Sequence, residues 1–129
     1  MKSMHLDLSI LPESYAVCQM PAKTAVPSWV TTSSFYSVTQ TSDEISIVCQ
    51  SKEVPAGVKA KQNWRMIKVE GPLDFSLTGI LASLAVPLAN VEISIFAIST
   101  FDTDYILVQD KNLPKAIKVL TESGFTVTR

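Results

Sequence analysis

No charged residue occurs between Asp74 and Glu92, and this uncharged stretch constrains the fold of the chain more than any other feature. Large apolar residues recur in it at the spacing that places them on one face of a helix. These residues are Leu77, Ile80, Leu81, Leu84 and Leu88. The rest of the helix surface is small and apolar instead of charged. We therefore predict a helix that begins near Ser76 or Leu77 and is covered on both sides, by its own sheet and by another domain or subunit.

A membrane-spanning helix needs about 20 apolar residues, and the uncharged stretch approaches that length. Four polar or helix-breaking residues within it argue against a membrane span: Gly79, Ser83, Pro87 and Asn90. A strand pattern also follows almost at once. Near the beginning of the chain, Asp7 arrives too soon for the apolar region of a signal peptide. The sequence therefore predicts a cytoplasmic protein with no membrane partner.

Strand patterns lie on both sides of this helix. Residues 64–70 alternate as a strand, residues 93–98 are apolar on both faces, as in a central strand, and residues 105–109 follow a polar loop, as in a hairpin. A second helix begins at Asp110 or Asn112, and a last strand ends the chain. The order β-α-β-β-α-β is that of a ferredoxin-like α+β unit, in which two helices cover one face of a four-stranded antiparallel sheet.

The first half of the chain is mostly strand. Four short strand patterns occur there: residues 6–11, 15–20, 35–39 and 44–50. Pro12 ends the first of them, so the first two patterns predict a hairpin. Residues 51–63 contain proline, glycine and three lysines without apolar periodicity, as in an exposed linker. We therefore predict an N-terminal unit over residues 1–62 and a ferredoxin-like unit over residues 63–129.

Composition and residue inventory exclude several functional classes. The net charge of −1 and the isoelectric point near 5.7 give no general attraction to nucleic acid, so we predict no nucleic-acid partner. His5 is the only histidine, and no nucleophile motif or phosphate-binding loop accompanies it. Cys18 and Cys49 each lie in an apolar strand pattern, which favours buried reduced thiols over a disulfide. We predict a protein that is not an enzyme and has no metal or cofactor.

Two segments carry a resemblance to a known family. Residues 71–89 read GPLDFSLTGILASLAVPLA, and residues 93–108 read ISIFAISTFDTDYILV. Both resemble the ACT-domain proteins related to the CASTOR arginine sensors, and weaker similarities extend upstream. The resemblance implies an ACT fold for the second half and an ACT-like first half. It also implies a regulatory or sensor protein that binds a small molecule, with amino acids as the ligand class.

The resemblance also implies which residues form the ligand pocket. They are Phe75, Thr78, Gly79 and Ile80 at the helix start, and Ser99, Thr100, Phe101 and Asp104 at the strand end and its loop. The first helical turn, which we expect to hold Thr78 to Ile80, offers free amides and the positive end of the helix dipole to a carboxylate. The carboxylate of Asp104 would bind an ammonium or guanidinium group.

Several alternatives stay open from the residues alone. Gly79 is also consistent with a purely structural role, in which it permits close packing of the helix on the sheet. Asp102 and Asp104 are also consistent with solvated loop acids, and Asp74 and Ser76 with helix caps. The arginine sensors have longer chains with two such halves, so a pocket between halves would require a homodimer or a different pairing here. A structural interaction module of ACT fold without a ligand is the alternative function.

Overall fold

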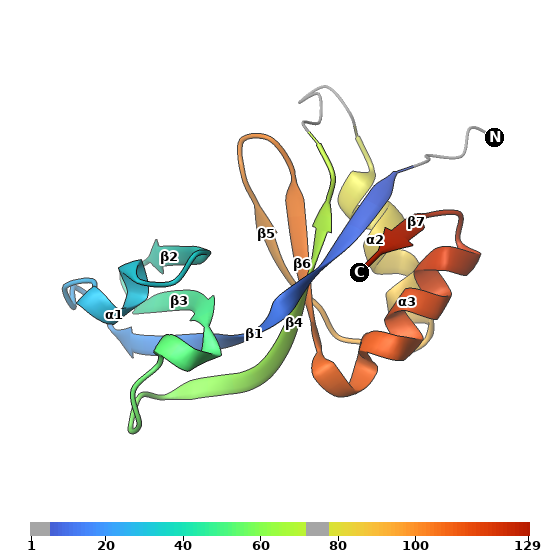
Figure 1. The fold of residues 1–129 in the computed structure, drawn as a ribbon. Coiled ribbons are helices and arrows are strands. Elements are labelled where there is room, and N and C mark those ends of the chain that lie inside the picture. The colour runs from blue at the N-terminus through green and yellow to red at the C-terminus, as the bar shows by residue number, and fades with distance from the viewer. Residues whose placement is uncertain (1–5, 72–77) are drawn as a thin grey trace. The chain divides into compact units, whose positions relative to one another are not determined.

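The computed structural model describes residues 6–71 and 78–129, and in it the chain forms two compact units (Figure 1). The larger unit joins the chain up to Pro12 with Arg65–Arg129. The smaller unit is Glu13–Trp64. The predicted division after residue 62 falls two residues before the second of these boundaries. The beginning of the chain differs from the prediction, because it belongs to the larger unit together with the C-terminal half.

The first strand explains this difference. The sequence predicts a hairpin broken at Pro12, whereas the structure has one continuous strand, β1 (Asp7–Pro21). Its first residues pair in parallel with β7 (Thr126–Thr128), and its second part pairs antiparallel with β3 (Glu44–Gln50). Pro12 lies between these two pairings, so its missing N–H group interrupts neither of them, and β1 continues past it beside β4. A proline therefore does not end this strand.

The larger unit has the predicted β-α-β-β-α-β order. Its elements are β4 (Ala60–Val69), α2 (Ile80–Asn90), β5 (Phe96–Ser99), β6 (Asp104–Gln109), α3 (Leu113–Glu122) and β7. A short 3-10 helix, Asp110–Asn112, precedes α3. The ferredoxin-like arrangement is confirmed with one addition, because the beginning of β1 lies between β4 and β7 in the strand order β7-β1-β4-β6-β5. The sheet of this unit therefore has five strands and not four.

One apolar core lies between the helices and the sheet of the larger unit. Both helices and the central strands contribute to it: Leu84 and Leu88 of α2, Ala116 and Leu120 of α3, Ile67 and Val69 of β4, and Ile106 and Val108 of β6. Successive side chains of a strand point to opposite faces. Lys68 and Tyr105 must therefore point to the face opposite the helices, while Asp104 shares the helix-facing side with Ile106. This alternation positions the candidate site.

The helix α2 begins at Ile80, later than the sequence predicts. The predicted first residues, Ser76 and Leu77, and the candidate cap Asp74 lie outside the described residues. Thr78 and Gly79 precede the helix, because the backbone of Gly79 has a left-handed φ of +76° that cannot continue into an α-helix. Pro87 lies inside α2, near its end, as the sequence indicates.

An apolar surface remains exposed on α2 and the neighbouring sheet edge. Ile80, Leu84 and Leu88 are buried as predicted, but Leu81 is 37% and Val86 is 55% exposed. The strand predicted to be central is shorter, β5, and it lies at the edge of the sheet beside β6 only. The amide of Ile93 bonds to the carbonyl of Leu88 at 2.9 Å, which ties this residue to the helix end and delays the strand.

The smaller unit is rich in strands, as predicted. It contains the second part of β1, β2 (Tyr36–Gln40), β3, a four-residue helix α1 (Ser28–Thr31) and a 3-10 turn, Ser51–Glu53. The strand β3 lies between β1 and β2 and pairs antiparallel with both. Cys18 and Cys49 are buried together in the core of this unit, with Ile45 and Ile47.

The register of β1 and β3 places the two thiols where they cannot form a disulfide. Cys18 lies opposite Ile47, and Cys49 lies opposite Ala16, so the cysteines occupy diagonal positions. Diagonal Cα atoms are about 7–8 Å apart, beyond the ~4.4–6.8 Å that a disulfide spans. The hydrogen bond with the Cys18 thiol, together with burial, raises the pKa of the Cys49 thiol. The same hydrogen bond lowers the pKa of the Cys18 thiol, so it is the burial of both side chains, and not their pKa values, that favours unreactive thiols.

We therefore expect the folded protein to react very slowly with a thiol reagent such as Ellman's reagent. After unfolding in denaturant without reductant, both cysteines should react, because neither is consumed by a disulfide. Absorbance of the released thiolate counts the free thiols in each state. Fewer than two free thiols in the unfolded protein would contradict this geometry.

Candidate functional site

The hairpin between β5 and β6 closes in a tight loop at one end of the larger unit. The backbone amide of Thr100 donates to the carbonyl of Thr103 at 2.8 Å. The Thr100 hydroxyl donates to the same carbonyl at 3.0 Å and accepts from the Thr103 amide at 3.3 Å. Only Phe101 and Asp102 remain between these residues, so they form the tip, where the Phe101 side chain is 80% exposed.

A buried hydrogen bond holds the hairpin end to the neighbouring strand. Thr103 is only 6% exposed, and its hydroxyl donates to the carbonyl of Val69 at 2.5 Å. Val69 is the last residue of β4, the strand that lies beside β6. This bond ties the loop to the end of the central strand. The polar side chains of the residues on either side of Thr103 therefore extend from a backbone that is fixed in place.

Two predicted site residues meet on the helix-facing side of the hairpin. Ser99 and Asp104 lie directly opposite each other in the register of β5 and β6. The Ser99 hydroxyl donates to Oδ1 of Asp104 at 2.6 Å. Asp104 is half-buried and points toward the helix layer, because it alternates with Ile106 and Val108 of the core. A carboxylate can accept further bonds beside this one.

The helix-start residues of the predicted pocket differ from the expected geometry. Phe75 lies outside the described residues, and Thr78 and Gly79 are exposed before the helix instead of inside its first turn. The carbonyl of Gly79 accepts the first helical bond, from the amide of Ser83 at 2.9 Å. Gly79 has no side chain to cap the amides of the first turn, which begins at Ile80. An uncapped helix start suits an anion.

The structure distinguishes two possible reasons for a glycine at position 79, close packing and a positive φ. No described atom lies within 4 Å of the position that a Cβ would take at this residue. Close packing of the helix on the sheet therefore does not account for the glycine. The positive φ of +76° does, because residues with a side chain rarely adopt it.

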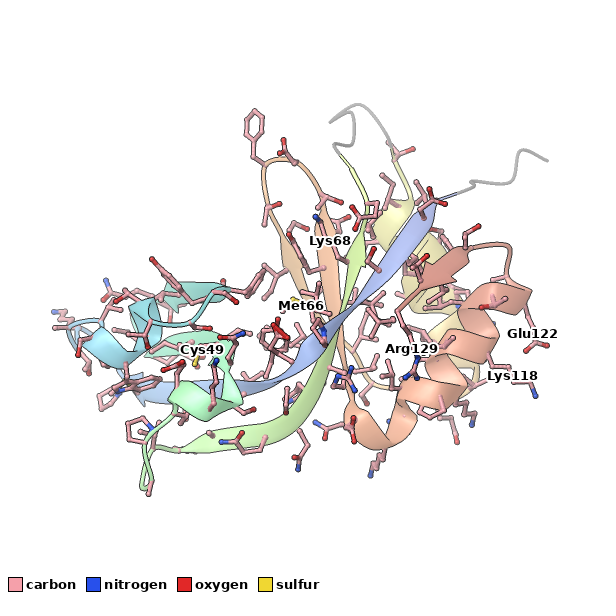
Figure 2. All side chains as sticks on the ribbon, in the orientation of Figure 1. Cys49, Met66, Lys68, Lys118, Glu122 and Arg129 are labelled. Carbon is pink, nitrogen blue, oxygen red and sulfur yellow. The ribbon has the colours of Figure 1, made fainter. Side chains whose placement is uncertain are left out.

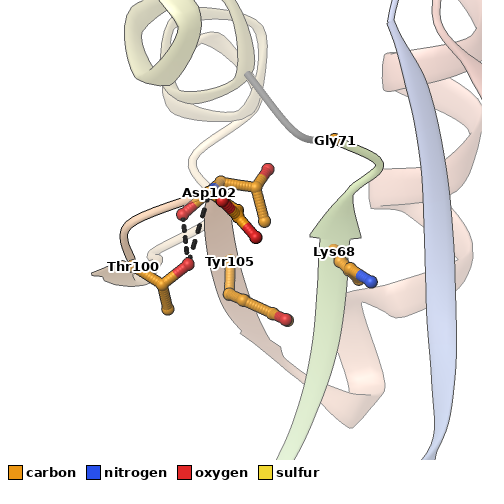
Figure 3. A pocket seen from close by; sticks show the side chains of 6 residues that line it. Lys68, Gly71, Thr100, Asp102 and Tyr105 are labelled. Atoms are coloured by element: carbon orange, nitrogen blue, oxygen red, sulfur yellow. Dashed lines mark hydrogen bonds between the residues drawn. The ribbon is translucent and has the colours of Figure 1, made fainter. Parts of the chain in front are cut away.

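A pocket of about 210 Å³ lies at the same end of the unit, on the face of the sheet that points away from the helices (Figure 3). The residues that line it are Lys68, Gly71, Thr100, Asp102, Thr103 and Tyr105. Thr100 is the one predicted site residue among them. Lys68 and Tyr105 are new, and their alternation with Ile67 and Ile106 is the sequence signal that assigns them to this face.

Among the described residues, 6–71 and 78–129, no group of three or more histidine, cysteine or acidic residues is arranged to hold a metal ion. No helix within these ranges is long and apolar enough to cross a membrane.

Three comparisons place the chain among known proteins. Residues 59–122 match the family described as the ACT domain, and residues 13–57 match a second family, described as an N-terminal domain. The cytosolic arginine sensor for mTORC1 subunit 1 of Rattus norvegicus is 32% identical over 108 residues, which are 78% of this chain and 30% of the sensor. This chain thus spans less than a third of the length of the arginine sensors that it matches.

Two solved structures extend the comparison. The protein Atu0741 from Agobacterium tumefaciens is 36% identical, with a TM-score of 0.93, and the match covers 98% of this chain and 96% of that protein. The regulatory subunit of aspartate kinase from Thermus thermophilus has a TM-score of 0.60 at 10% identity, over 92% of this chain and 93% of the subunit. At that identity the second comparison concerns the fold alone.

The buried hydrogen bond at Thr103 gives a direct test of this architecture. Thr103→Val keeps the shape of the side chain but leaves the Val69 carbonyl without its hydroxyl donor, which should lower the free energy of unfolding by about 1–3 kcal/mol. Urea unfolding followed by circular dichroism measures the loss. The matched control is Thr39→Val, at an exposed position of β2, which should stay within about 0.5 kcal/mol of wild type. Equal stabilities for the two variants would contradict the anchoring role.

Proposed function

Because this chain belongs to the ACT-domain family, we propose that it is a non-enzymatic regulatory protein that binds an amino acid at the end of the β5–β6 hairpin. The observation that carries the proposal is the position of Asp104. This half-buried carboxylate lies in the matched ACT segment and points toward the helix layer. The named arginine sensors among the relatives support amino acids as the ligand class and the cytoplasm as the location.

The proposed ligand lies between the start of α2 and the hairpin. Amides of the first turn, from Ile80 onward, bind the carboxylate of the amino acid, helped by the positive end of the helix dipole. Asp104, oriented by the Ser99 hydroxyl, accepts the ammonium or guanidinium group. The remaining residues of the proposed site are Phe75, Thr78, Gly79 and Phe101. The resemblance also implies Thr100, which lines the pocket on the opposite face of the sheet. Arginine itself is not assigned, because the chain spans only part of the arginine sensors.

A thermal-shift screen of the twenty amino acids tests whether any of them binds. A ligand at 100 times its dissociation constant stabilises the folded state by about 2.7 kcal/mol, which a melting curve resolves. For the amino acid that binds, we expect Asp104→Ala to weaken the helix-side binding by roughly ten- to hundred-fold, because a charged hydrogen bond contributes about 1.5–3 kcal/mol.

Asp43→Ala is the matched control for this helix-side site, because Asp43 is an exposed acid in the β2–β3 turn of the smaller unit and lines neither candidate site. Calorimetric titration of wild type and both variants gives the affinities. An affinity of the Asp104→Ala protein equal to that of wild type would remove this site assignment.

A second candidate function, an interaction module without a ligand, is favoured by the exposed apolar surface of α2. Leu81 and Val86 on this helix are exposed in the single chain, while small residues surround them. Monomeric proteins rarely expose a large contiguous apolar patch. We therefore propose that α2 packs against a second copy of the chain, in either function. A failed ligand screen with a stable dimer would favour the interaction module.

We predict that light scattering at micromolar concentration reports a mass of twice 14.1 kDa. Ala85→Glu should weaken the association, because it puts a charge on the outer apolar face of α2, beside Leu81. Ala56→Glu, in an exposed loop of the smaller unit, is the matched control and should stay dimeric. A soluble wild-type protein with the mass of a single chain would rule out the homodimer.

A further inference from the structure

We propose that the pocket on the sheet face away from the helices is a second binding site, which takes a small zwitterion that carries a carboxylate and an ammonium group. We call it the sheet-face pocket, and its lining is Lys68, Gly71, Thr100, Asp102, Thr103 and Tyr105. This inference goes beyond the proposed function, because the helix-side site of Asp104 lies on the opposite face of the same sheet.

The charges of the pocket specify the ligand class. Among the described residues that line it, Lys68, on the central strand β4, is the one cation, and Asp102, at the hairpin tip, is the one anion. Figure 3 shows the two residues approaching the pocket from different elements. A ligand with charges of both signs can pair with both residues, whereas a simple anion or cation would pair with one and be repelled by the other. A phosphate chain, which carries several negative charges, is a poorer match, because Lys68 supplies a single positive charge.

Lys68 can reach a ligand at small cost. Its ammonium lies 3.6 Å from Oε2 of Glu70, and the two side chains are 34% and 42% exposed. An ion pair this long and this exposed contributes little to stability. Oε1 of Glu70 also accepts a hydrogen bond from the Ser9 hydroxyl at 2.6 Å, so Glu70 keeps a partner when Lys68 turns away. Lys68 is therefore available to a carboxylate.

The rest of the lining fits a small polar molecule. Gly71 contributes only backbone to the lining, and Tyr105 adds an aromatic ring with a hydroxyl group. Thr100 and Thr103 are locked in the loop by their hydrogen bonds, so this part of the pocket is rigid before a ligand arrives. A volume of about 210 Å³ is smaller than the pockets of drug-sized ligands, which start near 300 Å³, and suits a free amino acid.

The test separates the two faces by mutation of the full-length chain. Each of the twenty L-amino acids, at millimolar concentration, is the probe in thermal-shift and calorimetric experiments. The substitution Asp104→Ala removes the helix-side carboxylate and leaves the lining of the sheet-face pocket unchanged. Lys68→Met and Asp102→Asn each remove one charge of the sheet-face pocket. The matched controls are Lys118→Met, on the exposed side of α3 (Figure 2), and Asp43→Asn, in the exposed β2–β3 turn.

We expect at least one amino acid to bind the Asp104→Ala protein, and Lys68→Met or Asp102→Asn in that background to weaken this binding roughly ten-fold or more. Neither control should change it. Binding that is lost in Asp104→Ala but kept in Lys68→Met and Asp102→Asn would overturn the sheet-face pocket and leave the proposed function standing. No binding to any of the proteins would overturn both. If Lys68→Met and Asp102→Asn weaken binding but Asp104→Ala does not, the result would support the sheet-face pocket and contradict the assignment of Asp104.

Discussion

The hydrogen bond from the Thr103 hydroxyl to the Val69 carbonyl fixes the end of the β5–β6 hairpin against the end of β4. Both candidate sites depend on this bond, because β6 begins directly after Thr103, with Asp104 on one side of the sheet and Tyr105 on the other. The bond is buried, so water does not compete for it. The bond thereby holds the loop in place, with Asp104 on the helix side of the sheet and Lys68 on the other side.

The local patterns of the sequence predict most elements of the larger unit. The helices and strands follow from apolar periodicity, which depends only on nearby residues. Strand partners are a different matter, because they are chosen by contacts between distant segments. The continuous β1, which passes Pro12 and inserts beside β7, could not be inferred from its own alternation. The apolar sequence of β5 predicts a central strand, but β5 lies at the edge of the sheet, because composition alone does not determine which strands are its neighbours.

The candidate site was partly predictable. The resemblance identified Ser99 and Asp104, which the structure brings together through a hydrogen bond, and Thr100, which lines the pocket. The alternation of Lys68 with Ile67 already assigns it to the face opposite the core, but no local pattern indicates that β4 and β6 are neighbours. Apolar spacing predicts too early a start for α2 because it continues through Gly79, whereas the positive φ of this residue prevents the helix from beginning before Ile80.

We propose that this ACT-domain protein binds an amino acid at the hairpin end of its larger unit. A nuclear magnetic resonance titration of the ¹⁵N-labelled protein with the amino acid that shifts its melting curve tests this binding. We expect amide signals to move most in Gly79 to Ile80 and in Ser99 to Tyr105, while those of β2 and β3 stay in place. Shifts that concentrate in the smaller unit, or an absence of shifts at a saturating concentration, would contradict binding at this end.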